Sequence, residues 1–302
     1  MVENPLATHV TKLNNGVEMP RLGLGVWKTD NYHAKESVKM AIKNGYRMID
    51  DAKQYGNETG VGEGLSEAIK ENGLNRKDLF ITSKLFNGDE GYESTLNAIE
   101  GTLDRLQLTY LDLYLIHWPV DGLYNDSWKA MEKLYHEGKI RAIGISNFDV
   151  PRMKNLLKHA DVTPAVNQME FNPLSQEKEI LNFCNQTGIQ MEAWSPLGGG
   201  EALKNETIAK IAQEHNKTVA QVILRWNFQR NIVTIPKSVH EKRIIENSNI
   251  FDFELSDKDI EIINSLDKDK HSITYDDFIW HNPDGDVDSV EKWSDSPINY
   301  QV

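Results

Sequence analysis

The feature that most limits the fold of this chain is a regular alternation of short apolar runs with longer amphipathic runs. The apolar runs are typical of buried strands because they are short and rich in branched side chains. Several of the amphipathic runs end at a glycine, as helices often do. The pattern predicts eight strands, at residues 21–27, 46–50, 79–85, 111–117, 140–146, 165–171, 189–195 and 231–238.

Helices are expected between and after these strands. They are predicted at residues 33–45, 58–73, 91–108, 127–138, 150–160, 176–188, 204–215, 218–230 and from 256 onward. Strands separated by helices pair in parallel through right-handed crossovers. Eight such units close into a (β/α)8 barrel, so the expected class is α/β with a TIM-barrel architecture.

The two ends of the chain fall outside this alternation. Residues 9–20 are predicted to form a β-hairpin around Asn15 and Gly16, because Asn-Gly favours a left-handed turn. Residues 267–302 are acidic and rich in Asp, Asn and Ser, and we expect either a tail over the barrel mouth or partial disorder. We see no linker before this tail, so the prediction is a single barrel domain over residues 1–302.

The composition excludes several classes of partner. The formal net charge of −13 argues against nucleic acid and anionic membranes, and it serves solubility. No apolar run reaches the ~20 residues of a membrane span, and the first residues lack a signal-peptide pattern. The single cysteine, Cys184, allows no internal disulfide, and it is typical of helix packing and of a reducing compartment. We therefore expect a cytoplasmic protein, and no metal site, since no His/Cys cluster has ligand spacing.

Four residues that can move a proton or hold a charge lie where three of the predicted strands end. Asp50 and Tyr55 follow one another at the first of these ends, Lys84 lies at the second, and His117 lies at the third. Active sites of such barrels are built at the carboxyl ends of the strands. Free tyrosine has a pKa of about 10, and a nearby ammonium lowers it by favouring the phenolate. We therefore expect Tyr55 to donate a proton beside Lys84. Asp50 would hold Lys84, and His117 would donate a hydrogen bond to a carbonyl oxygen.

These residues lie in a series of motifs that resembles a known family. The motifs DDAKQYGNE, LFITSKLFN, LDLYLIHWP, AIGISNF, VNQMEFNP, AWSPLG and IPKS occur in this order, and together they resemble the aldo-keto reductase family. The resemblance extends from the hairpin to about Leu266 and is greatest to the glyoxal, methylglyoxal and diketogluconate reductases. It implies NADPH-dependent reduction of aldehydes and ketones, including dicarbonyls and keto esters, with the same four catalytic residues. It also implies a monomer.

A dinucleotide site is implied by the same resemblance. The first strand is not followed by the G-x-G-x-x-G of a Rossmann domain, so the cofactor must lie along the barrel mouth. In the family, the positions of Ser146, Asn147 and Gln168 bind the nicotinamide carboxamide, and that of Trp194 stacks on the ring. The positions of Ser195 and Leu197 would contact the pyrophosphate and ribose.

The segment IPKSVHEKRIIEN bears on the choice between NADPH and NADH. Lys237, Ser238 and Arg243 place two cations and a hydroxyl close together, which suits a phosphate monoester. The family reads the adenosine 2′-phosphate here, so NADPH is the expected cofactor, with Glu246 and Asn247 near the adenine. Without the resemblance, a solvated basic turn would be the favoured interpretation of this segment.

Aromatic residues near the strand ends are candidates for the walls of a substrate pocket. Trp27, Phe86 and Trp118 follow strand ends, and Tyr275, Phe278 and Trp280 lie in the tail, where ordinary packing is an alternative. The family often has tryptophan at the position of Phe86 and threonine or serine at that of Asp51. The smaller ring leaves more room, and the acid adds charge beside the four catalytic residues. Trp128 and Trp226 lie on helical faces and are assigned to the core.

Two other functions are open at this stage. One is a regulatory barrel that binds NADPH as a sensor with little turnover, although an intact catalytic set argues against pure binding. The other is a barrel hydrolase with similar strand-end residues, which would not need Gln168, Trp194 and Lys237 together.

Overall fold

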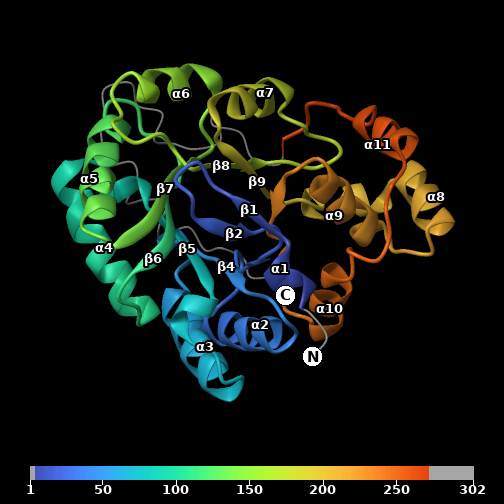
Figure 1. Cartoon of the computed structure of the whole chain (residues 1–302), viewed down its shortest axis with the longest axis horizontal. Helices are drawn as coiled ribbons and strands as arrows, with labels where there is room; N and C mark the ends of the chain where they lie inside the picture. Colours follow the sequence, from blue (N-terminus) through green and yellow to red (C-terminus); the bar gives the residue numbers. More distant parts are fainter. Residues whose placement is uncertain (1–3, 272–302) are drawn as a thin grey trace.

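The computed structural model describes residues 4–271, in which parallel strands form a ring with helices around it (Figure 1). The ring contains β3 (Leu24–Gly25), β4 (Met48–Asp50), β5 (Phe80–Leu85), β6 (Leu111–Ile116), β7 (Ile140–Ser146), β8 (Val166–Glu170), β9 (Gln190–Trp194) and β10 (Val233–Thr234). Each strand pairs in parallel with the next one in sequence. Bridges from Leu22 to Thr234 and from Gly25 to Lys237 close the ring. The predicted (β/α)8 barrel is thus confirmed.

The first and last strands are shorter than the sequence predicted. Regular ladder structure covers two residues of 21–27 and two of 231–238, and the closing seam continues as isolated bridges. Pro236 has no N–H to donate, so the ladder cannot continue through it. The seam instead uses single bonds such as Gly23 N–H to the carbonyl of Thr234, at 2.9 Å.

The helices cover the outside of the ring. They are α2 (Asn31–Lys43), α3 (Glu58–Glu71), α4 (Tyr92–Leu106), α5 (Tyr124–His136), α6 (Val150–Leu157), α7 (Lys178–Thr187), α8 (Glu206–Glu214), α9 (Val219–Gln229), α10 (Glu241–Ser248) and α11 (Asp257–Asn264). Short 3₁₀ turns are η1 (Lys53–Tyr55), η2 (Arg76–Asp78), η3 (Asn87–Asp89), η4 (Gly198–Gly200) and η5 (Ala202–Lys204). The expected final helix does begin with a capping box, formed by Ser256 and Asp259. The helix α1 (Pro5–Thr8) was not predicted.

The predicted hairpin is present and closes one end of the barrel. Strand β1 (Val10–Lys12) pairs antiparallel with β2 (Glu18–Pro20). Its side chains bond to residues that begin or precede three barrel strands. Asn15 donates to the carbonyl of Arg141 at 3.0 Å, Asn14 donates to that of Pro164 at 2.9 Å, and Thr11 Oγ1 donates to Gln190 Oε1 at 2.9 Å. The hairpin therefore covers the amino-terminal end of the strands, and the site must be sought at the carboxyl end.

Two apolar cores hold the fold together. One fills the ring and includes Met19, Met48 and Leu113, and the other lies between the ring and the helices. Trp128, Trp226 and Cys184 are buried in the outer core, as their positions on helical faces predicted. Within residues 4–271, no helix is long and apolar enough to span a bilayer. The same residues include no cluster of His, Cys, Asp and Glu that could hold a metal ion.

Candidate active site

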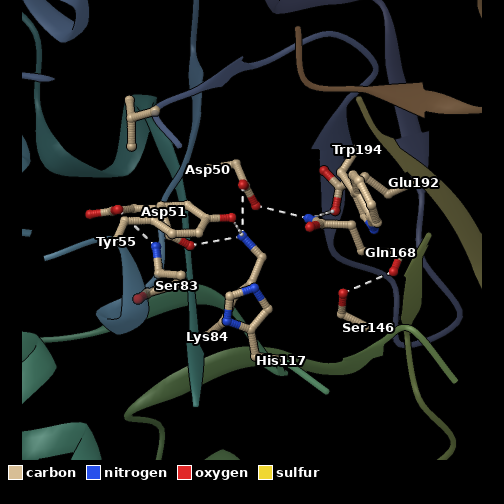
Figure 2. A network of polar contacts seen from close by, with 12 residues as sticks. Asp50, Asp51, Tyr55, Ser83, Lys84, His117, Ser146, Gln168, Glu192 and Trp194 are labelled. Carbon is tan, nitrogen blue, oxygen red and sulfur yellow. Dashed lines mark hydrogen bonds and ion pairs between the residues drawn. The ribbon is translucent and has the colours of Figure 1, made fainter. Parts of the chain in front are cut away.

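Lys84 is the centre of the polar network at the carboxyl end of the strands (Figure 2). Its side chain is fully buried, and its Nζ donates to Asp50 Oδ2 at 2.7 Å and to the Asp51 carbonyl at 2.9 Å. Nζ also lies 3.2 Å from Tyr55 Oη. Three of the four predicted catalytic residues are therefore in direct contact.

Strand register places these residues. Asp50 is the last residue of β4 and lies opposite Thr82 of β5. Lys84 lies two residues further along β5 and points the same way as Thr82, because side chains alternate along a strand. The turn η1 returns Tyr55 toward Lys84, and Gly56 ends that turn with a left-handed φ of +69°. Alternation along neighbouring parallel strands thus brings the acid, the lysine and the phenol together.

The contacts set the protonation of Lys84 and Tyr55. Burial lowers the pKa of Lys84, but the attraction of Asp50 and Tyr55 outweighs it, so the pKa lies above its ordinary value. Burial raises the pKa of Tyr55, and the ammonium of Lys84 opposes this increase without overcoming it. The expected lowering of this pKa by the ammonium is therefore outweighed by burial. Tyr55 is therefore a protonated phenol at neutral pH, next to a permanent positive charge.

His117 completes the predicted set from the neighbouring strand. It directly follows β6, and its ring lies edge-on to that of Tyr55 with 5.7 Å between centroids. Burial, and then the charge of Lys84, hold the pKa of His117 well below its ordinary value. The imidazole is thus neutral at pH 7 and can donate a hydrogen bond from one ring nitrogen.

Gln168 connects this set to an acid that the sequence reasoning missed. Its Nε2 donates to Asp50 Oδ1 at 2.8 Å and to Glu192 Oε2 at 2.8 Å. Glu192 lies on β9 with no exposed surface, and burial followed by repulsion from Asp50 raises its pKa to about 8. The sequence did contain a signal, because Glu192 lies inside the apolar run IQMEAWS.

The other predicted carboxamide contacts belong to the same network. Ser146 Oγ donates to the Gln168 carbonyl at 2.9 Å. Asn147 Nδ2 donates to the His117 carbonyl and to Ser146 Oγ, both at 3.0 Å. Trp194 Nε1 donates to Asn147 Oδ1 at 2.9 Å, which fixes the indole at this edge (Figure 2). The four residues predicted around the nicotinamide are therefore neighbours.

Two residues of the predicted dinucleotide site adopt left-handed backbone conformations. Asn147 has φ of +62° and Ser195 has φ of +48°. This backbone conformation is costly for residues other than glycine, and such strain often occurs at functional sites. Ser195 Oγ accepts from Gly199 N–H at 3.1 Å, and Leu197 lies half-buried against the outer core. Both positions lie in the loop that follows β9.

Three cations, Lys28, Lys237 and Arg243, lie near the seam where the first and last strands meet. Burial, and then repulsion from Lys28 and Arg243, lower the pKa of Lys237. Within residues 4–271, none of these three side chains has a carboxylate within ion-pair distance. Lys28 was not predicted, although it directly follows Trp27 at a strand end. Among the described residues these three charges have no carboxylate counterion, so the cluster suits an anionic ligand.

The remaining predicted cofactor residues lie in α10 or just before it. Ser238 Oγ accepts from His240 N–H at 3.1 Å, so its hydroxyl is already used at the start of that helix. Glu246 accepts from Thr218 Oγ1 at 2.8 Å, and Asn247 is buried. These two residues stay predictions for the adenine contact.

The aromatic side chains predicted for the pocket divide into two groups. Trp118 is buried, and Trp27 and Phe86 are half-buried, each just beyond a strand end at the edge that holds Lys84. Tyr275, Phe278 and Trp280 lie outside the described residues. A separate cavity of about 260 Å³, lined by α3, Arg76 and residues 106–109, lies toward the opposite end of the strands and has no part in this site.

Asp51 is a buried acid beside the network. Its Oδ1 accepts from Ala52 N–H at 2.7 Å, and its Oδ2 has no partner within residues 4–271. Burial, and then repulsion from Glu58, raise the pKa of Asp51 well above its ordinary value. Glu58 itself accepts from Ser83 Oγ and Arg105 Nε, each at 2.7 Å. The raised pKa favours the neutral acid, so Asp51 adds less charge beside Lys84 than the sequence suggested.

Comparisons with known proteins identify the family and agree with the barrel fold. Residues 21–268 match the model of the Aldo/keto reductase family. The glyoxal reductase of Bacillus subtilis (strain 168) is 60% identical over 260 residues, which are 86% of this chain and 93% of that protein. The 9,11-endoperoxide prostaglandin H2 reductase of Trypanosoma cruzi (strain CL Brener) is 48% identical over 85% of this chain and 91% of its own length. The crystal structure of Bombyx mori aldo-keto reductase in complex with NADP aligns with a TM-score of 0.86 at 31% identity, covering 89% of this chain and 96% of that one.

Proposed function

The chain belongs to the aldo/keto reductase family, and from this premise we propose that it reduces aldehydes and ketones to alcohols with NADPH, using Tyr55 as the proton donor. The observation that carries the proposal is the contact of Lys84 Nζ with Tyr55 Oη at 3.2 Å and with Asp50 Oδ2 at 2.7 Å. A buried ammonium held this close to a phenol stabilises the phenolate that remains when the proton leaves.

The residues at the strand ends fit NADPH. The unneutralised cations Lys28, Lys237 and Arg243 suit its phosphates, and Gln168 Oε1 accepts no hydrogen bond within residues 4–271. Trp194 presents an indole held by Asn147 beside this oxygen. Relatives support the assignment, since the Bombyx mori structure is a complex with NADP. When bound, NADPH supplies the hydride.

The chain's own residues supply the proton and the orientation. His117, being neutral, would donate a hydrogen bond to the carbonyl oxygen and hold it near Tyr55 Oη. Tyr55 would then protonate that oxygen as negative charge develops on it. Lys84 would stabilise the resulting phenolate, and Asp50 would keep Lys84 charged and in place.

We further propose small carbonyl compounds, including dicarbonyls and keto esters, as the substrates. The support is the 60% identity to a protein named glyoxal reductase and the half-buried rings of Trp27 and Phe86 near the site. Aromatic walls favour a compact substrate with an apolar side.

The test is the loss of NADPH absorbance with methylglyoxal and with an aromatic aldehyde. We expect turnover by the parent and a fall in kcat of about 10²–10⁴ for Tyr55→Phe, the usual effect of losing a general acid. Tyr135→Phe, on the outer helix α5, is the matched control and should keep the parent rate. Parent protein that binds NADPH without reducing any carbonyl would instead support the sensor function. Failure to bind NADPH would contradict the proposal entirely.

A further inference from the structure

We propose that Glu192 is a positioning residue that, together with Asp50, holds both amide hydrogens of the Gln168 side chain. It thereby turns the side-chain oxygen Oε1 of Gln168 toward the N–H of the nicotinamide carboxamide. This inference rests on the proposed NADPH-dependent function. It adds a residue to the site and states which end of the carboxamide Gln168 recognises.

The first step is the use of the Gln168 side-chain nitrogen. A primary amide nitrogen has two hydrogens to donate, and Nε2 lies 2.8 Å from Asp50 Oδ1 and 2.8 Å from Glu192 Oε2. Both acceptors are buried, and the other Asp50 oxygen is occupied by Lys84. Gln168 can therefore offer a ligand only its Oε1, as an acceptor.

The second step concerns the neighbouring donors. Asn147 Nδ2 donates its hydrogens to the backbone carbonyl of His117 and to Ser146 Oγ. The Ser146 hydroxyl in turn donates to the backbone carbonyl of Gln168. These donors are thus already used within the protein, and Gln168 Oε1 is the acceptor that stays available to a ligand. A carboxamide that approaches with its N–H toward Gln168 satisfies both partners.

The third step is the role of Glu192 as a second anchor. Asp50 alone would fix the position of Nε2 but would leave the amide plane free to turn about that single bond. A second acceptor from β9 removes this freedom. Burial and the nearby Asp50 raise the pKa of Glu192 to about 8, so at pH 7 it is mainly a neutral carboxyl and can accept through one oxygen. Glutamine is a neutral substitute with the same acceptor, whereas leucine lacks it.

The experiment compares binding of two dinucleotides by quenching of tryptophan fluorescence at pH 7. One is NADPH, and the other is its acetylpyridine analogue, in which a methyl ketone replaces the carboxamide and no N–H remains. An acceptor left without its donor weakens binding, so the parent should favour NADPH by about tenfold. Glu192→Leu should reduce this preference to about threefold or less, chiefly by weakening NADPH, and Glu192→Gln should keep it. The change in preference is the coupling between Glu192 and the ligand N–H.

Asp51→Asn is the matched control, because it replaces another buried acid beside Lys84 that has no contact with Gln168. Its preference should equal that of the parent. Equal weakening of both dinucleotides by Glu192→Leu would overturn the inference, because it would indicate a purely structural role. Should that variant not fold, a loss of preference in Glu192→Gln would overturn it as well. A parent that binds neither dinucleotide would refute the proposed function, and the inference with it.

Discussion

Three buried acids, Asp50, Asp51 and Glu192, surround the single ammonium of Lys84. Asp50 takes the direct ion pair, at 2.7 Å. Burial then raises the pKa of Asp51 and Glu192, since a second or third negative charge would be neither solvated nor paired. The site therefore holds one direct ion pair, Glu192 is mainly neutral near pH 7, and the raised pKa of Asp51 favours its neutral form as well. This charge state leaves Lys84 free to act on Tyr55.

The raised pKa of Glu192 predicts a specific dependence of stability on pH. The folded pKa is about 8, whereas a free glutamate titrates near 4.3. Between these values the unfolded chain releases a proton that the folded protein keeps, so this group's contribution to stability falls as pH rises through this window. Glu192→Gln cannot ionise. Between pH 5.5 and 8, the free energy of unfolding of the variant should therefore rise relative to the parent, by at most about 1.4 kcal/mol per pH unit.

Chemical denaturation at several pH values measures this difference. Glu63→Gln, which replaces an exposed acid on α3, is the control. A flat difference between Glu192→Gln and the parent would mean that Glu192 is ionised in the folded protein.

At the scale of elements, the contact between α2 and α3 depends on a glycine inside a helix. A Cβ on Gly60 would lie 2.0 Å from the Asn31 carbonyl oxygen, a backbone atom that cannot move aside cheaply. Gly60→Ala should therefore destabilise the fold by about 1–3 kcal/mol, the usual cost of overpacking. Gly101 in α4 is the control, because its Cβ would meet only the flexible end of Arg105. Gly101→Ala should stabilise by about 0.5–1 kcal/mol through helix propensity. An equal decrease in Tm for both variants in thermal melts would contradict this role of Gly60.

The elements also show how far the sequence could predict this protein. Apolar runs and strand ends predicted the ring, and motif order predicted an aldo-keto reductase, both of which are confirmed. The short seam strands were overestimated, because Pro236 interrupts a ladder that the apolar run continues. The hydrogen bond from Gln168 to Glu192 joins neighbouring strands. The alternation of polar and apolar residues along each strand does not predict which two polar side chains will meet inside the barrel. Lys28 could be assigned to the site only from the closed barrel, in which the segment before it lies beside Lys237.

At the scale of the whole molecule, barrel closure and charge act together. Bridges between the first and last strands bring the segment before Lys28 next to Lys237, although the two lie at opposite ends of the sequence. The protein as a whole carries a net charge of −13, yet these cations have no carboxylate partner within residues 4–271. A phosphate bound there would neutralise the cluster and connect both sides of the seam.

This arrangement predicts that NADPH stabilises the whole fold more than NADH does. A ligand present at 100 times its Kd adds about 2.7 kcal/mol to the free energy of unfolding, which corresponds to an increase in Tm of about 4 °C for a chain of this size. NADH at the same concentration lacks the 2′-phosphate and should raise Tm by about 2 °C or less.

The double variant Lys237→Met, Arg243→Met separates the phosphate from the rest of the dinucleotide. Its NADPH-induced increase in Tm should fall to the level of NADH, whose own effect should stay the same, because the lost interaction involves only the 2′-phosphate. Differential scanning fluorimetry with both cofactors measures the two shifts side by side. Equal loss for NADPH and NADH would place the cluster at the pyrophosphate instead. Since the cations lie on both sides of the closing seam, the same measurement reports how strongly a bound phosphate holds the first and last strands of the barrel together.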